Sequence, residues 1–167
     1  NKRRYGLDID PATVVNSAAV HPAIIATLRA FNPPGSKVLM PCPSYSGFYS
    51  DIRVVNCKPA DVPFKIGSDG RYAMDFEALE RSISYDTPTL ILCNPQNPTG
   101  NVWSKDDLMT IGEICLRRRV VVLADLARAV DVDGGPRAAC GRPPAQYPPR
   151  GDRDHRAGDQ ERREHRE

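Results

Sequence analysis

The stretch TLILCNPQNPTG, residues 89–100, decides the fold class of this chain. It begins with an apolar run that is typical of a buried strand, and it continues into a loop with two Asn-Pro pairs and a Gly. Each proline fixes its own φ angle and keeps the preceding residue extended, so Asn94 and Asn97 are held in place. We therefore expect a rigid loop that presents a side chain at a fixed point after the strand.

Two more apolar runs have the same character, KVLMP at 37–41 and VVVLAD at 120–125. Helical spacing of apolar residues predicts helices at 20–31, at 74–83 and from Ser104 onward. Apolar strands separated by amphipathic helices indicate an α/β fold, here a partial three-layer sandwich with a mostly parallel sheet. In such sheets ligands bind at the carboxyl ends of the strands.

Local signals refine the predicted helices. The first helix is expected to bury Ile24, Leu28 and Phe31, which follow a helical period. Asp75 stands at the N-cap position of the second helix, and Ser104 begins the third with capping-box spacing.

Length and composition limit the class of protein. The chain has 167 residues, of which 40% are hydrophobic, enough for one core. Its 23 basic and 21 acidic residues give a charge of +2, so neither a nucleic-acid partner nor a membrane partner is expected. The longest apolar run, 120–124, is too short to span a bilayer. The chain lacks an initiating Met and is expected to be an internal piece of a longer protein.

The five cysteines form no C-x-x-C pair and are odd in number. This usage favours reduced thiols and a cytoplasmic protein. No metal site is predicted.

Composition changes abruptly after Leu126, which divides the chain into residues 1–126 and a tail, 127–167. The tail contains no Lys, Ile, Leu, Phe or Met and carries 9 Arg, 5 Pro and 5 Gly. Such a segment buries too little apolar surface to order itself, so we expect it to be disordered. Two alternatives stay open: a basic arm for nucleic acid, and out-of-frame translation of GC-rich coding sequence.

Three ordered motifs suggest a family: PCPSYSGFY at 41–49, LCNPQNPTGNVWS at 92–104 and VVVLAD at 120–125. Together they resemble the class I/II aminotransferase group of fold-type-I pyridoxal-phosphate enzymes. NPQNPTGNVW followed by IGEIC is most similar to the cystathionine β-lyase-like C–S lyases of that group. The resemblance covers residues 1–125, as part of the large domain. It implies a C–S β-lyase or aminotransferase that acts on amino acids as a homodimer.

The resemblance also implies roles for five residues in binding pyridoxal 5'-phosphate. Asp125 corresponds to the acid that pairs with the pyridine nitrogen, and Asn97 to the amide that binds the ring hydroxyl. Tyr45 matches the aromatic residue that stacks on the ring. Ala19 and Val20 match the Gly-Val pair whose N–H groups bind the phosphate. From residue types alone, a solvated Asp, a turn Asn and a core Tyr remain open.

The same resemblance has two geometric consequences. The family's matching X-Pro bonds are commonly cis, so Cys42-Pro43 and Asn97-Pro98 are predicted to be cis. The five site residues are expected to converge on one cleft at the carboxyl ends of the strands. His21 and Asn94 are read as a first-turn surface histidine and an ordinary turn residue.

Departures from the family pattern bear on activity. Ala19 stands where the family has Gly. The family's Schiff-base Lys, which follows the Asp in an S-x-x-K context, has no counterpart, because all five lysines precede Asp125. A chain without this Lys is expected to be a truncated, inactive copy with no catalytic residue of its own. The alternative is a non-catalytic remnant or binding module that holds pyridoxal phosphate non-covalently.

Overall fold

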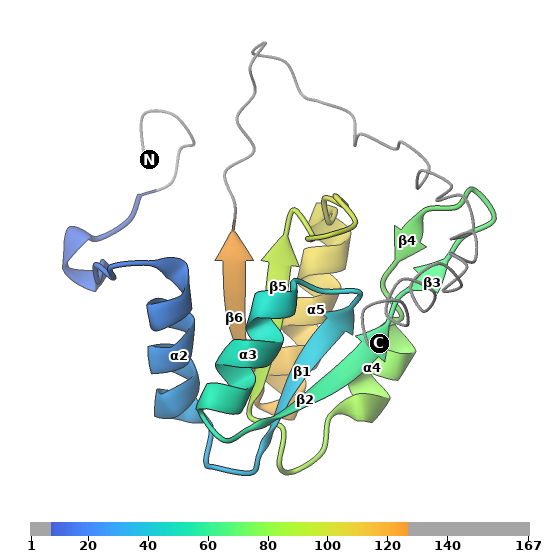
Figure 1. Ribbon diagram of the computed structural model, residues 1–167. Helices are drawn as coiled ribbons and strands as arrows, with labels where there is room; N and C mark the ends of the chain where they lie inside the picture. Colours follow the sequence, from blue (N-terminus) through green and yellow to red (C-terminus); the bar gives the residue numbers. More distant parts are fainter. Residues whose placement is uncertain (1–7, 127–167) are drawn as a thin grey trace, which may run out of the picture.

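The computed structural model describes residues 8–126 (Figure 1). The predicted tail, 127–167, lies outside the described residues, so its predicted disorder stays a prediction. A 3-10 turn, η1 (Pro11–Thr13), precedes the first helix. The helices are α2 (Val20–Phe31), α3 (Ser46–Val54), α4 (Phe76–Ser82) and α5 (Lys105–Arg118). The strands are β1 (Lys37–Cys42), β2 (Lys58–Pro63), β3 (Lys65–Ile66), β4 (Tyr72–Ala73), β5 (Thr89–Asn94) and β6 (Val121–Leu126).

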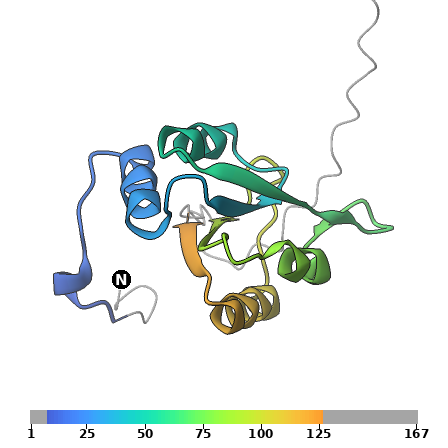
Figure 2. The ribbon, with the colours of Figure 1, turned by 90° about the horizontal axis from the view of Figure 1, so that it is seen from below.

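The described residues form one four-stranded sheet in the order β2-β1-β5-β6, with every neighbouring pair parallel. Helices α2 and α3 cover one face, and α4 and α5 cover the other (Figure 2). This three-layer arrangement confirms the predicted α/β fold. Parallel strands need helical crossovers, which explains why helices and strands alternate along the chain.

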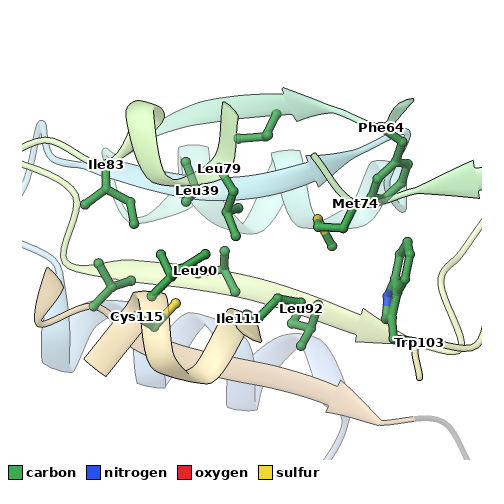
Figure 3. Close-up of a cluster of buried hydrophobic side chains, with 13 residues drawn as sticks. Leu39, Phe64, Met74, Leu79, Ile83, Leu90, Leu92, Trp103, Ile111 and Cys115 are labelled. Carbon is green, nitrogen blue, oxygen red and sulfur yellow. The ribbon is translucent and has the colours of Figure 1, made fainter. Parts of the chain in front are cut away.

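Each face of the sheet has its own apolar core, because successive side chains of a strand point to opposite faces. Leu39, Leu90 and Leu92 pack with α4 and α5 (Figure 3). Val38 and Ile91 pack with α2 and α3. Full burial of one such side chain contributes about 1.5–3 kcal/mol, so the two cores hold both helix layers on the sheet.

The predicted helix caps are confirmed. Asp75 accepts a hydrogen bond from the Ala78 backbone at 3.0 Å. Ser104 and Asp107 form a complete capping box, in which each side chain accepts from the other residue's backbone N–H. These bonds satisfy N–H groups that the first turn of a helix leaves without a partner.

Replacement of Ser104 by Ala is expected to lower the free energy of unfolding by about 1 kcal/mol, because the Asp107 N–H loses its acceptor. Urea unfolding followed by circular dichroism measures this loss. The matched control is Ser50→Ala, an exposed position on α3, with an expected change below about 0.5 kcal/mol. Equal changes at the two positions would contradict the capping role.

One predicted core residue is wrong. Ile24 and Leu28 are buried as expected, but Phe31 is 49% exposed at the end of α2. Asn32, the next residue, is buried in its place, and its Oδ1 accepts a hydrogen bond from the Thr89 hydroxyl at 2.9 Å. Phe31 is the last residue of α2, and the chain buries Asn32 rather than the phenyl ring at this end of the helix.

Four of the helices and strands have no counterpart in the sequence prediction: α3, β2 and the antiparallel strands β3 and β4. Strand β2 contains Pro59 and Pro63, which weaken its strand signal. Its place at the edge of the sheet tolerates them, because an edge strand leaves one side of its backbone unpaired.

Candidate functional site

Three strands deliver side chains to one edge of the sheet. Because β1, β5 and β6 are parallel, their carboxyl ends lie together (Figure 1). The loop 43–45 follows β1, the loop 95–100 follows β5, and Asp125 is the penultimate residue of β6. Helix α2 runs opposite to the strands and begins at the same edge (Figure 1).

Asp125 is half-buried and pairs with Cys93 of the neighbouring strand. Leu123, two residues earlier, packs against the core beneath α2 and α3. Alternate residues of a strand share a face, so Asp125 points to the α2 and α3 side of the sheet. Its carboxylate therefore lies on the face that carries the first turn of α2.

The Cys93 thiol connects Asp125 with the loop after β5. It lies 3.9 Å from Asp125 Oδ2 and donates to the Pro95 carbonyl at 3.2 Å. Burial raises the pKa of Cys93, a hydrogen bond with the backbone of Asn97 opposes this rise, and the charge of Asp125 adds to it. The thiol therefore stays protonated at neutral pH and lies between the Asp125 carboxylate and the backbone of Asn97.

The loop after β5 is anchored at both ends. Gln96 bonds Asn101 and Gly100 through its backbone, each at 2.7 Å, and Gly100 has a φ of +74°, which favours glycine. Asn94 Oδ1 accepts from the Trp103 backbone at 3.1 Å, so Asn94 closes the turn as predicted. The Asn97 side chain is exposed to solvent.

Proline geometry follows the family pattern. The bonds Cys42-Pro43 and Asn97-Pro98 are cis, which confirms both predictions, and Asn94-Pro95 is cis as well.

Tyr45 stands at the N-cap position of α3 with 38% of its surface exposed. Its ring contacts the edge of Phe48 at a centroid distance of 5.4 Å and the ring of His21 at 5.8 Å. The Tyr45 ring therefore packs on the core residue Phe48 and stays partly exposed to solvent at the carboxyl ends of the strands.

Gln96 connects the loop after β1 with the loop after β5, and no sequence motif predicted this contact. Its Nε2 donates to the Pro43 carbonyl at 2.9 Å, across 53 positions of sequence. The residue is only 2% exposed, and Oε1 has no hydrogen-bond partner within residues 8–126. A polar residue in a loop is usually solvated, so its burial here depends on how the loops pack.

The first turn of α2 has no side-chain cap. Ala19 is the N-cap residue in an extended conformation, φ −161°, and the Ser17 hydroxyl donates to its carbonyl at 3.0 Å. The first N–H groups of a helix carry partial positive charge and attract anions. Val20 and His21 supply such groups here, while Pro22 has none. Any residue can adopt this extended conformation, so the replacement of the family's Gly by Ala19 causes no backbone strain.

The described structure thus brings the five predicted residues to one edge, in two connected groups. The Cys93 thiol lies near the Asp125 carboxylate and near the backbone of Asn97. Tyr45 contacts the ring of His21, which belongs to the first turn of α2. The Gln96 bond to Pro43 connects the groups. A carboxylate, an amide, an aromatic face and a helix N-terminus gathered at one edge suit a flat heteroaromatic ligand that carries an anionic group.

Within residues 8–126, no cluster of three or more His, Cys, Asp or Glu side chains could hold a metal ion. No helix in that same part of the chain is both long enough and apolar enough to cross a bilayer.

Comparison with known proteins decides the family. A family model described as Aminotransferase class I and II matches residues 1–146. The chain belongs to this family. The resemblance expected from the three motifs is confirmed.

Relatives in the family include both lyases and aminotransferases. The chain is 38% identical over 125 residues to cystathionine beta-lyase PatB of Bacillus subtilis strain 168, covering 74% of this chain and 32% of PatB. It is 35% identical over 126 residues to a probable N-succinyldiaminopimelate aminotransferase, DapC, of Mycobacterium tuberculosis, covering 74% and 31%. The chain therefore spans about a third of the length of these relatives.

Solved structures share the fold of the described part. A PLP-bound putative aminotransferase from Clostridium difficile 630 matches with a TM-score of 0.71 and 35% identity, over 74% of this chain and 32% of that one. Cystalysin from Treponema denticola, which contains a pyridoxal 5'-phosphate cofactor, matches with a TM-score of 0.70 and 32% identity, with the same coverage.

Proposed function

We propose that this chain carries part of the cofactor site of a pyridoxal-phosphate-dependent C–S β-lyase or aminotransferase that acts on amino acids. The observation that carries the proposal is the gathering of Asp125, Asn97, Tyr45 and the uncapped start of α2 at one edge of the sheet. These groups fit the cofactor, which has a basic ring nitrogen, a flat ring and a phosphate. The PLP-bound relatives support this reading.

Each residue has a distinct task in this proposal. The Asp125 carboxylate accepts a hydrogen bond from the protonated ring nitrogen and keeps that nitrogen charged. The Asn97 amide donates to the ring hydroxyl oxygen. Tyr45 packs its ring against the pyridine face. The backbone N–H groups of Val20 and of its N-cap residue Ala19 hold the phosphate. When bound, the cofactor supplies an electron sink for negative charge that develops at the substrate Cα.

The positions of the lysines support non-covalent binding by this 167-residue chain. Lys37 and Lys58 begin β1 and β2, at the edge opposite to the site. Lys65 pairs with Asp75 at 3.1 Å, and Lys105 begins α5, which covers the other face of the sheet. We therefore assign no Schiff-base Lys within the described residues and propose that the chain is inactive by itself.

The proposal also covers the oligomeric state and the location of the whole protein. We infer a homodimer for the whole protein by family membership alone. A cytoplasmic location is supported by the free thiols of Cys42, Cys57, Cys93 and Cys115, since the reducing cytosol keeps thiols unpaired.

Calorimetric titration with pyridoxine 5'-phosphate tests the site. This analogue lacks the aldehyde, so it cannot react with surface lysines. Asp125→Asn keeps the size of the side chain but removes its charge, and we expect it to weaken binding about tenfold or more, as the loss of a charged hydrogen bond does.

The matched control is Glu113→Gln, the same chemical change at an exposed position of α5, with unchanged affinity expected. Equal affinities of wild type and Asp125→Asn would contradict the assigned role of Asp125. No binding by the folded wild type would contradict the proposed function.

A further inference from the structure

A carboxylate is buried beneath the candidate site. Asp51 lies in α3 beside the core residue Ile52, and only 6% of its side chain is exposed. Burying a carboxylate is costly unless it is paired and hydrogen-bonded. Its Oδ2 lies 2.7 Å from Nδ1 of His21, in the first turn of α2. The carboxylate thereby holds the imidazole ring from a position 30 residues away in sequence.

The His21 ring in turn contacts Tyr45. Their centroids are 5.8 Å apart, with 35° between the ring planes. Phe48 meets Tyr45 edge-on, at 89°. A methyl group added at Gly47 would overlap Cε1 of Tyr45 and lie 2.6 Å from Cε1 of His21, so both rings rest over the bare backbone of Gly47. Three neighbours therefore limit the positions that the Tyr45 ring can take.

We propose that His21 is a positioning residue for Tyr45: the Asp51 carboxylate holds the imidazole, and the imidazole keeps the phenol ring in one orientation. The consequence for ligand binding rests on the proposed function, in which Tyr45 stacks on the cofactor. His21 is thus more than the surface residue that its sequence position suggests. Its side chain is 44% exposed because it lies at the edge of the site, with one ring nitrogen bound to Asp51.

The unliganded chain gives the first readout. Proton-carbon correlation spectra of tyrosine-labelled protein contain signals from six Tyr, and a Tyr45→Phe variant assigns those of Tyr45. We expect His21→Ala and Asp51→Leu to shift or broaden the Tyr45 signals. Asp51→Asn keeps an acceptor for the imidazole N–H and should preserve them. Arg29→Ala, at an exposed position in the last turn of α2, is the control and should leave them unchanged.

The second readout is affinity for pyridoxine 5'-phosphate. His21→Ala and Asp51→Leu should weaken it about tenfold, the scale of one lost aromatic contact, and Asp51→Asn should restore most of the affinity. Should His21→Ala fail to fold, nuclear Overhauser effects between the His21 and Tyr45 rings in the wild type decide instead, and their absence overturns the proposal.

Two further outcomes distinguish the positioning role of His21 from the proposed function. Unchanged Tyr45 signals in a folded His21→Ala variant overturn the proposal, even when affinity falls, because His21 would then act on the ligand directly. Tyr45 signals that respond as expected in a chain that binds no pyridoxine 5'-phosphate support the positioning role and reject the proposed function.

Discussion

The purified chain, supplied with pyridoxal 5'-phosphate and cystathionine, is expected to release pyruvate no faster than the free cofactor does. All five lysines of the sequence precede Asp125, and none of the four within the described residues is assigned to the cofactor. A Schiff-base Lys acts both as a nucleophile and as the base that moves the Cα proton. A positioned base alone contributes about 10²–10⁴-fold to a rate, so its loss should remove measurable turnover.

A coupled assay that reduces pyruvate with lactate dehydrogenase measures the rate. Free cofactor without protein sets the background, and the Asp125→Asn variant tests whether any excess rate comes from the site. Turnover above background that Asp125→Asn abolishes would contradict the prediction and would show that another group replaces the Lys. Turnover that Asp125→Asn leaves intact would point to a contaminating enzyme.

Trp103→Ala is expected to lower the free energy of unfolding by about 4 kcal/mol, which combines a large core cavity with a lost hydrogen bond. Trp103 is 5% exposed and lies 5.2 Å from the Phe64 ring, centroid to centroid (Figure 3). Its Nε1 donates to the Cys93 carbonyl at 3.1 Å. The indole therefore anchors the end of the loop that carries Asn97 against the end of β5.

Urea unfolding followed by far-ultraviolet circular dichroism measures this effect, since the substitution removes the single Trp of the chain. Trp103→Phe keeps a ring in the core but loses the indole bond, with an expected cost of about 1–2 kcal/mol. Met109→Ala, at an exposed position on α5, should cost less than about 0.5 kcal/mol. A Trp103→Ala cost as small as that of Met109→Ala would show that the loop is not anchored there.

The helices and strands that could be predicted have local signals. The apolar runs before Asn94 and Asp125 are strands, and Asp75 and Ser104 cap helices. A cap forms bonds within about three residues, and a buried strand needs only a continuous apolar run, so a short window of sequence contains the whole signal. Phe31 shows the limit of such a window, because the period of the helix does not tell where the core ends.

The residues of the candidate site were predicted from their motifs, but the residues that hold them in place were not. Gln96 reads as a loop residue, yet it is buried and bonds Pro43. Asp51 was not singled out in the sequence, yet its carboxylate is buried against His21. Neither partner lies within one turn or one strand of the other, so no periodic pattern reports the contact.

The sequence by itself determined helices α2, α4 and α5, strands β1, β5 and β6, and their parallel arrangement in a sheet. It also indicated the edge at which Tyr45, Asn97 and Asp125 should act. Only the tertiary structure decided that the Cys93 thiol lies near both the Asn97 backbone and Asp125. It also decided that Asp51 holds His21 beside Tyr45. The physical reason is range: propensity and capping depend on bonds between near neighbours, whereas these contacts exist only once packing of α2 and α3 on the sheet excludes water between distant segments.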